Sequence, residues 1–183
     1  MTNKNKKLKK SNIKKKIMKK VLAIILLLMG LIVPTILAVK QVKFNQGCEG
    51  YLKQAADAST PDFALERINR AIEYIESNNL TSGYTSLFWK TEDENIEFWY
   101  QNILACREEL QDCLQSSQLE KTNVLMKVRE SLTDNGEHVV ITIPQGIHKY
   151  PHNGLWALLL SISLIVLIGS ACYLGVCLFD KFL

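Results

Sequence analysis

Residues 155–179 read LWALLLSISLIVLIGSACYLGVCLF, a stretch without a single charged side chain. A helix needs about 20 apolar residues to cross the hydrocarbon core of a bilayer, so this stretch is long enough to span it with some tilt. Tyr150 and Trp156 stand at its start, where aromatic rings favour the membrane interface, and Asp180 and Lys181 close its end. The sequence therefore predicts a transmembrane helix over 154–179.

A second uncharged run, VLAIILLLMGLIVPTILAV, covers residues 21–39. Its length also suits a membrane span, and we expect Pro34 to bend the helix without ending it. A lysine-rich segment followed by an apolar run is also typical of a secretory signal peptide, here with Ala38 before the cleavage point. We favour a retained anchor, because the run is longer than a usual signal and the bulky Ile36 stands where a small residue is preferred.

The charge of the chain changes sign along its length. The first 20 residues hold ten lysines and no acidic residue, whereas residues 40–153 hold 17 of the 18 acidic residues against 11 Lys and Arg, a net charge of −6 (11 − 17). Such an acidic region does not bind nucleic acid by charge. We expect the tail to contact anionic lipid headgroups through the lysines nearest the first span: Lys14, Lys15, Lys16, Lys19 and Lys20.

The same lysines predict the orientation of the chain. Positive charge beside a span stays on the cytoplasmic side, so residues 1–20 and the short tail 180–183 are expected in the cytoplasm. Residues 40–153 then face the exoplasmic side of a plasma (inner) membrane. The predicted organisation is a two-pass membrane protein with one aqueous domain between the spans.

The aqueous domain is predicted to be mainly α, with about four helices and one short strand. Thr60 followed by Pro61 is typical of a helix start, and Thr91 with Glu94 matches a capping box. The β-branched run 139–143 predicts a strand with no partner in the chain, which either lies against the helices or pairs across a subunit boundary. The expected helices cover residues 40–59, 61–78, 91–114 and 119–132.

Three cysteines fall in the aqueous domain, and an exoplasmic location would allow them to pair. Cys106 and Cys113 lie seven apart on one predicted helix, roughly 10 Å along its axis, which is too far for a disulfide. Any internal bond would therefore join Cys48 to Cys106 or to Cys113. The alternative, which we favour, is that all three are buried thiols.

Two regions are candidates for contact with other molecules. Aromatic residues gather between positions 84 and 100. Most of them are expected to pack a short connector, residues 84–90, onto the helices. Residues at the connector's tip are the interaction candidates: Tyr84, Phe88, Trp89 and Lys90, with Trp89 the most exposed. Small residues in the spans predict helix packing, with Ala23 and Gly30 facing the other span, and Ala171 and Gly175 available for a partner or a second copy.

No motif for catalysis or metal binding occurs in the sequence. We find no nucleophile elbow, no glycine-rich phosphate loop and no histidine–carboxylate spacing, and we expect neither a cofactor nor a metal. The favoured hypothesis is a non-enzymatic membrane protein whose exoplasmic domain is a protein-interaction or scaffolding module. The alternatives are a sensor or accessory subunit of an envelope complex and, least favoured, an enzyme with a dispersed site.

Overall fold

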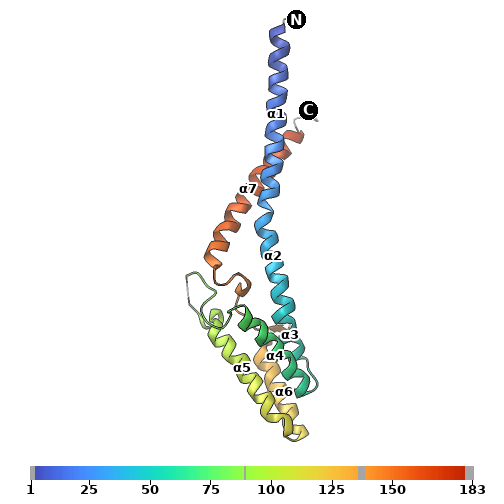
Figure 1. Ribbon diagram of the computed structural model, residues 1–183, viewed down its shortest axis with the longest axis vertical. Coiled ribbons are helices and arrows are strands. Elements are labelled where there is room, and N and C mark those ends of the chain that lie inside the picture. Colours follow the sequence, from blue (N-terminus) through green and yellow to red (C-terminus); the bar gives the residue numbers. More distant parts are fainter. Residues whose placement is uncertain (1–2, 89, 136–138, 180–183) are drawn as a thin grey trace. The chain divides into compact units, whose positions relative to one another are not determined.

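The computed structural model describes residues 3–88, 90–135 and 139–179, with their side chains over 14–88, 90–134 and 140–176. This part of the chain is mainly α-helical, as predicted (Figure 1). Its α-helices are α1 (Asn3–Gly30), α2 (Ile32–Phe44), α3 (Gly50–Ala56), α4 (Pro61–Ser77), α5 (Ile96–Asp112), α6 (Gln118–Leu132) and α7 (Asn153–Phe179). A π-helical turn, Asn45–Glu49, joins α2 to α3, so α1 to α3 form one long helix and the described chain has five helices in all.

Two of these helices are long and apolar enough to cross a membrane. One lies within the long helix over Lys14–Ala56, and the other covers Asn153–Val176 of α7. The chain divides into two compact units, one formed by 1–38 with 155–183 and the other by 39–154. We call the second of these the aqueous unit, and each unit is described separately.

Within the first unit, α1 packs against α7 at Gly30. A Cβ added to Gly30 would lie 2.8 Å from Cγ of Leu167 and 3.4 Å from the carbonyl oxygen of Ser163, so only glycine allows this approach. Ala23, one heptad before Gly30, is also buried. Both residues were expected to face the other span; the contacts of Gly30 confirm this for Gly30, whereas the contact that buries Ala23 stays a prediction.

Pro34 explains why the helix is irregular just after Gly30. Proline has no N–H, so it cannot donate to the carbonyl four residues earlier, which is that of Gly30. The Ser163 hydroxyl donates to this carbonyl instead. The chain leaves regular α-helix at Leu31 alone and resumes it at Ile32.

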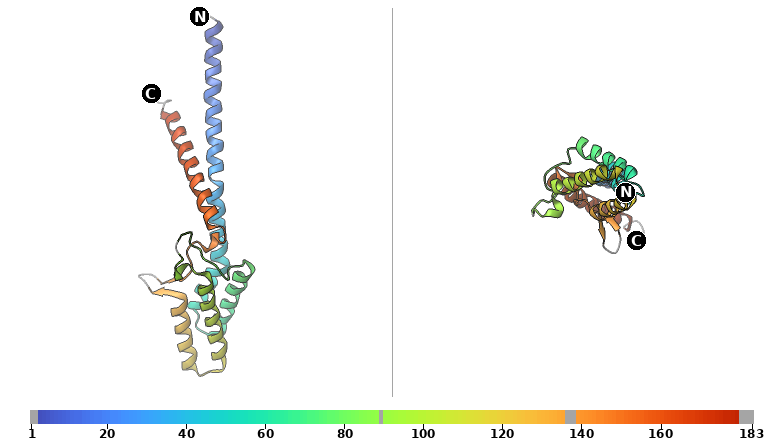
Figure 2. Two further views of the ribbon diagram at one scale, coloured as in Figure 1. Left: turned by 90° about the vertical axis from the view of Figure 1, so that its left-hand side faces the viewer. Right: turned by 90° about the horizontal axis from the view of Figure 1, so that it is seen from below.

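In the aqueous unit α3, α4, α5 and α6 pack together (Figure 2). α4 packs between α3 and α5, while α6 contacts α3, α4 and α5. Each helix contributes an apolar face with helical spacing to a single core. The central side chains are Phe44, Cys48 and Leu52 of the long helix, Ile68 and Ile75 of α4, Ile96, Ile103 and Leu110 of α5, and Val128 of α6.

The starts of α4 and α5 show how capping fixes the helix ends. Thr60 caps α4 by accepting from the Phe63 N–H, and Pro61 is the first helical residue, as predicted. The prediction of a capping box at Thr91 is wrong, because residues 92–94 form a short 3-10 helix without a side-chain cap. Asn95 caps α5 instead, because its side chain accepts from the backbone N–H groups of residues 97 and 98 at 3.0 and 3.2 Å.

The strand expected near residue 139 has a partner in the same chain, so the prediction that it is unpaired within the chain was wrong. β2 (Val139–Ile141) pairs antiparallel with β1 (Thr133–Asn135), with Thr133 opposite Ile141. The Thr142 N–H donates to the Leu132 carbonyl at 2.9 Å and continues the ladder into α6. The hairpin is therefore an extension of α6.

Candidate functional site

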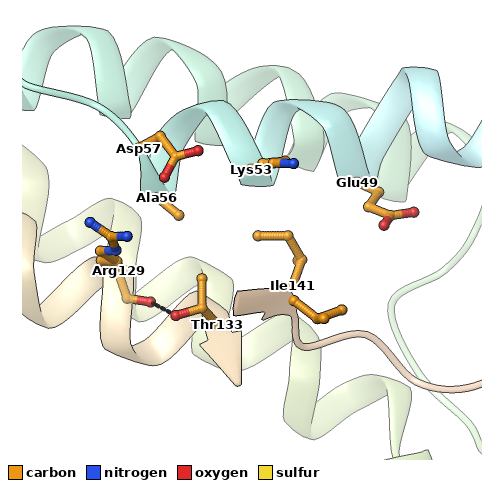
Figure 3. A pocket seen from close by; sticks show the side chains of 8 residues that line it. Glu49, Lys53, Ala56, Asp57, Arg129, Thr133 and Ile141 are labelled. Atoms are coloured by element: carbon orange, nitrogen blue, oxygen red, sulfur yellow. Dashed lines mark hydrogen bonds between the residues drawn. The ribbon is translucent and has the colours of Figure 1, made fainter. Parts of the chain in front are cut away.

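A groove of about 430 Å3 lies between the long helix and the hairpin (Figure 3). Both walls belong to the aqueous unit. The long helix and its end supply Glu49, Lys53, Ala56 and Asp57, and the opposite wall holds Arg129, Thr133, Val140 and Ile141. Its volume falls within the range of small-molecule and peptide sites.

The first wall follows from the spacing of three charged residues. Glu49, Lys53 and Asp57 are four apart, and residues four apart lie on one face of a helix. Figure 3 shows their side chains along the same edge of the groove. Ala56 is buried beside them, so this wall has charged groups at its rim and an apolar base.

The second wall is fixed by the junction of α6 and the hairpin. Thr133 donates from its hydroxyl to the Arg129 carbonyl at 2.8 Å, which anchors the last turn of α6 (Figure 3). The strand register then sets Ile141 beside Thr133, and both are buried at the groove floor. The Val140 side chain points to the opposite face of the strand from Ile141, and 55% of it is exposed at the rim.

Four charged side chains of both signs surround this apolar floor. In the described part of the chain no ion pair joins Glu49, Lys53, Asp57 or Arg129 to one another. These four charges therefore do not neutralise one another across the groove.

The polar groups of the groove are two carboxylates, an ammonium, a guanidinium and one hydroxyl. Its lining has no Ser, Cys or His, and the one hydroxyl, on Thr133, is already donated to the backbone. Among the described residues no group of three or more His, Cys, Asp or Glu is placed to hold a metal ion.

The structure separates the aromatic residues of 84–100 into two sets. Trp99 and Tyr100 are buried in the core; the Trp99 indole donates to the Thr142 carbonyl at 2.9 Å and the Tyr100 hydroxyl to Glu76 at 2.6 Å. Burial and the hydrogen bond to Glu76 raise the pKa of Tyr100. These two residues therefore join α5 to Thr142 and to α4, and their packing against the connector stays a prediction.

The interaction candidates lie in the connector. Phe88 is 84% exposed and Tyr84 is partly exposed, with the Lys90 ammonium 5.2 Å from the centre of the Tyr84 ring. Trp89, the residue expected to be most exposed, lies outside the described residues. Contact of this set with a protein or with headgroups stays a prediction.

The connector is tied to the first residues of α7. Asn153 donates from its amide to the carbonyls of Thr85 at 2.6 Å and Gly146 at 3.3 Å. Leu87 lies 3.3 Å from the position of an added Cβ on Gly154. The exposed tip is thus held beside the point where the apolar helix starts.

The tail lysines and the small residues of α7 are in helices. Lys14, Lys15, Lys16 and Lys19 are exposed on α1, and Lys20 is partly exposed. On α7, Ala171 is exposed and a Cβ added to Gly175 meets nothing within 4 Å. Lipid contact at the lysines and a partner at Ala171 and Gly175 stay predictions.

The three cysteines of the aqueous unit are free thiols, and all are buried. The disulfide from Cys48 to Cys106 or Cys113 is not formed in this structure. Burial raises the pKa of each thiol, most strongly for Cys48, where the nearby Glu49 charge adds to the effect. A buried thiol in apolar surroundings acts as a small hydrophobe.

Sequence reasoning missed the groove. The spacing of Glu49, Lys53 and Asp57 on one helix face was visible, but charges at this spacing are ordinary on a solvated helix. The opposite wall depends on the β1–β2 pairing, which carries no local signal. Comparison of the chain with protein-family models, with curated proteins and with solved structures found no match.

Proposed function

We propose that the chain is a non-enzymatic two-pass membrane protein whose aqueous unit binds a segment of a partner protein in the groove. The observation that carries this proposal is the set of four charged side chains of both signs, without ion pairs among them, around the floor of Ala56 and Ile141.

The apolar surface of α1 and α7 supports membrane insertion. Side chains such as Met29, Ile165 and Ile168 are exposed around these helices within their own unit. A helix that is apolar all round is stable when lipid covers it. In the proposed topology residues 1–20 and 180–183 are cytoplasmic and 40–153 are exoplasmic, because the tail lysines stay inside.

The partner segment is expected to be extended and to carry both signs of charge. Carboxylates 49 and 57 flank Lys53 at helical spacing, and Arg129 faces them. Residues two apart on an extended chain lie roughly 6.5 Å apart, close to the spacing of residues one helical turn apart. An alternating basic and acidic strand over an apolar residue fits this wall.

Photocrosslinking from Val140 tests the proposal in cells. A photoreactive residue replaces Val140, which lies at the exposed rim, and a second variant carries it at Met126, an exposed α6 residue outside the groove. We expect a discrete protein adduct at 140 and none of the same mass at 126. Mass spectrometry of the adduct identifies the bound segment.

Charge reversal tests whether the groove binds the protein that is crosslinked at position 140. Lys53→Glu and Arg129→Glu should each lower the adduct yield about tenfold or more, because like charges in contact are costly. The matched control is Arg70→Glu, an exposed α4 residue paired only with Glu73. An adduct that persists in both groove variants, or that Arg70→Glu removes equally, contradicts the proposal.

One observation favours the sensor hypothesis as the second candidate. A volume of about 430 Å3 with both signs of charge also suits a small zwitterionic ligand. In that case no protein adduct forms at 140, and amino-acid-like ligands raise the Tm of the purified chain. That increase should be absent from Arg129→Glu.

A further inference from the structure

A second cavity, of about 260 Å3, lies in the aqueous unit beside the end of α2. Lys40 and Lys43 of α2 line it together with His148, and the tyrosine rings of Tyr74 and Tyr150 form its sides. Phe44, Leu80 and Ile147 are buried at its base. No Asp or Glu is among the described residues that line it, so the charge of its lining is entirely positive.

The positive groups of this cavity act on one another. Burial lowers the pKa of His148, and the nearby charges of Lys149 and Lys40 lower it further. Because the lysine charges disfavour the protonated form of His148, the electrostatic potential at this histidine is positive. An anion placed in the cavity would be attracted by the lysine charges and would favour the protonated form of His148.

The position of the lysines on α2 determines how far the cavity lies from the hydrocarbon core of the proposed membrane. Lys40 and Lys43 follow Val39, the last residue of the proposed span, by one and four residues. At about 1.5 Å per residue they lie roughly 1.5 to 6 Å beyond the hydrocarbon core. The headgroup layer on each side of a bilayer is roughly 5–8 Å thick, so both ammonium groups fall within it.

We propose that this cavity binds the phosphate of an anionic phospholipid headgroup in the exoplasmic leaflet. Lys40, Lys43 and His148 surround the phosphate, and the Tyr74 and Tyr150 rings with the apolar base accommodate the glycerol. The inference rests on the proposed spans and topology and is independent of the partner groove. It gives the aqueous unit a lipid contact separate from that of the cytoplasmic lysines.

Depth and lining favour a lipid over other anions. A phosphate free in solution would be attracted by the lysines but would gain nothing from the apolar base of the cavity. An acidic protein segment would have to enter the headgroup layer to reach Lys40. A phospholipid of the surrounding bilayer is already there at high local concentration.

The test uses the full chain reconstituted in nanodiscs that contain equal amounts of phosphatidylglycerol and phosphatidylcholine. A photoreactive residue replaces Asn78, an exposed residue on the rim of the cavity. We expect an adduct of phosphatidylglycerol mass, in preference to phosphatidylcholine. Lys40→Gln combined with Lys43→Gln should lower its yield roughly 30-fold, since each lysine near a surface contributes about 1 kcal/mol and tenfold corresponds to 1.4 kcal/mol.

Matched controls separate this site from other cationic surfaces. Arg70→Gln with Lys121→Gln removes the same charge elsewhere in the aqueous unit, and Lys14→Gln, Lys15→Gln and Lys16→Gln remove tail charge. Both should leave the adduct unchanged. If the Lys40 and Lys43 variant loses its native Tm, His148→Gln replaces it and should lower the yield severalfold.

Three outcomes would overturn the proposal. Equal labelling of the two lipids, or labelling that survives loss of the cavity charges, means that Asn78 only touches bulk lipid. Loss of the lipid adduct when inorganic phosphate at millimolar concentration is present during irradiation means that a soluble phosphate is the ligand. A protein adduct at Asn78 in cells, in place of lipid, means that the cavity takes an acidic protein segment.

Discussion

Gly47 of the long helix packs directly against Tyr74 of α4. The position of a Cβ on Gly47 lies 2.2 Å from Cδ2 of Tyr74, a distance that no side chain tolerates. The Tyr74 ring lies edge-on to Phe44, with ring centres 6.0 Å apart. The absence of a side chain at Gly47 therefore positions the ring that forms one side of the lysine-lined cavity.

We expect Gly47→Ala to lower the free energy of unfolding of the full chain in detergent by about 1–3 kcal/mol, the usual cost of overpacking. Thermal unfolding followed by circular dichroism measures this. Gly175→Ala is the control, because nothing lies within 4 Å of its added Cβ. Equal Tm values for the two variants would show that Tyr74 does not pack on Gly47.

Cys48 is predicted to resist alkylation in the folded chain at neutral pH. Thiolate is the reactive form, and burial together with the Glu49 charge raises the pKa of this thiol, so little thiolate is present. Its side chain is also 0% exposed. Mass spectrometry after maleimide treatment should find Cys48 modified only in denaturant, and rapid modification without denaturant would contradict the packing of the π-helical turn 45–49 in the core.

At the scale of elements, the helices could be predicted from the sequence and the hairpin could not. Thr60, Pro61 and the apolar spacing after them identify α4 because capping and amphipathicity are local properties. Residues 133–135 read Thr-Asp-Asn, without the apolar alternation of a strand, and they are extended because they pair with β2. The groove needs that pairing, so its second wall was beyond sequence reasoning.

Replacing Asn95 tests which residue caps α5. Asn95→Ala should destabilise the chain by about 1 kcal/mol, because two backbone N–H groups lose their acceptor. Thr91→Ala should cost less, since the Thr91 hydroxyl contacts only the Glu94 side chain at 3.1 Å. Denaturant unfolding measures both changes in stability. A larger loss of stability for Thr91→Ala than for Asn95→Ala would support the predicted capping box.

At the scale of the whole molecule, charge and hydropathy divide the chain in the way that a membrane requires. The helices of one unit expose apolar side chains around their circumference, whereas the aqueous unit buries one core and carries the acidic residues. Both features could be predicted, because they depend on composition over long windows. The groove and the lysine-lined cavity could not, because each joins residues far apart in the sequence.

Both proposed sites require the aqueous unit to be exoplasmic, and cysteine labelling in intact cells tests this most directly. Val140→Cys introduces an exposed thiol in the aqueous unit and Lys15→Cys one in the lysine tail, with a cysteine-free chain as background. A membrane-impermeant maleimide should label Val140→Cys in intact cells and Lys15→Cys only after the membrane is permeabilised. The reverse pattern would place the groove in the cytoplasm and contradict the account.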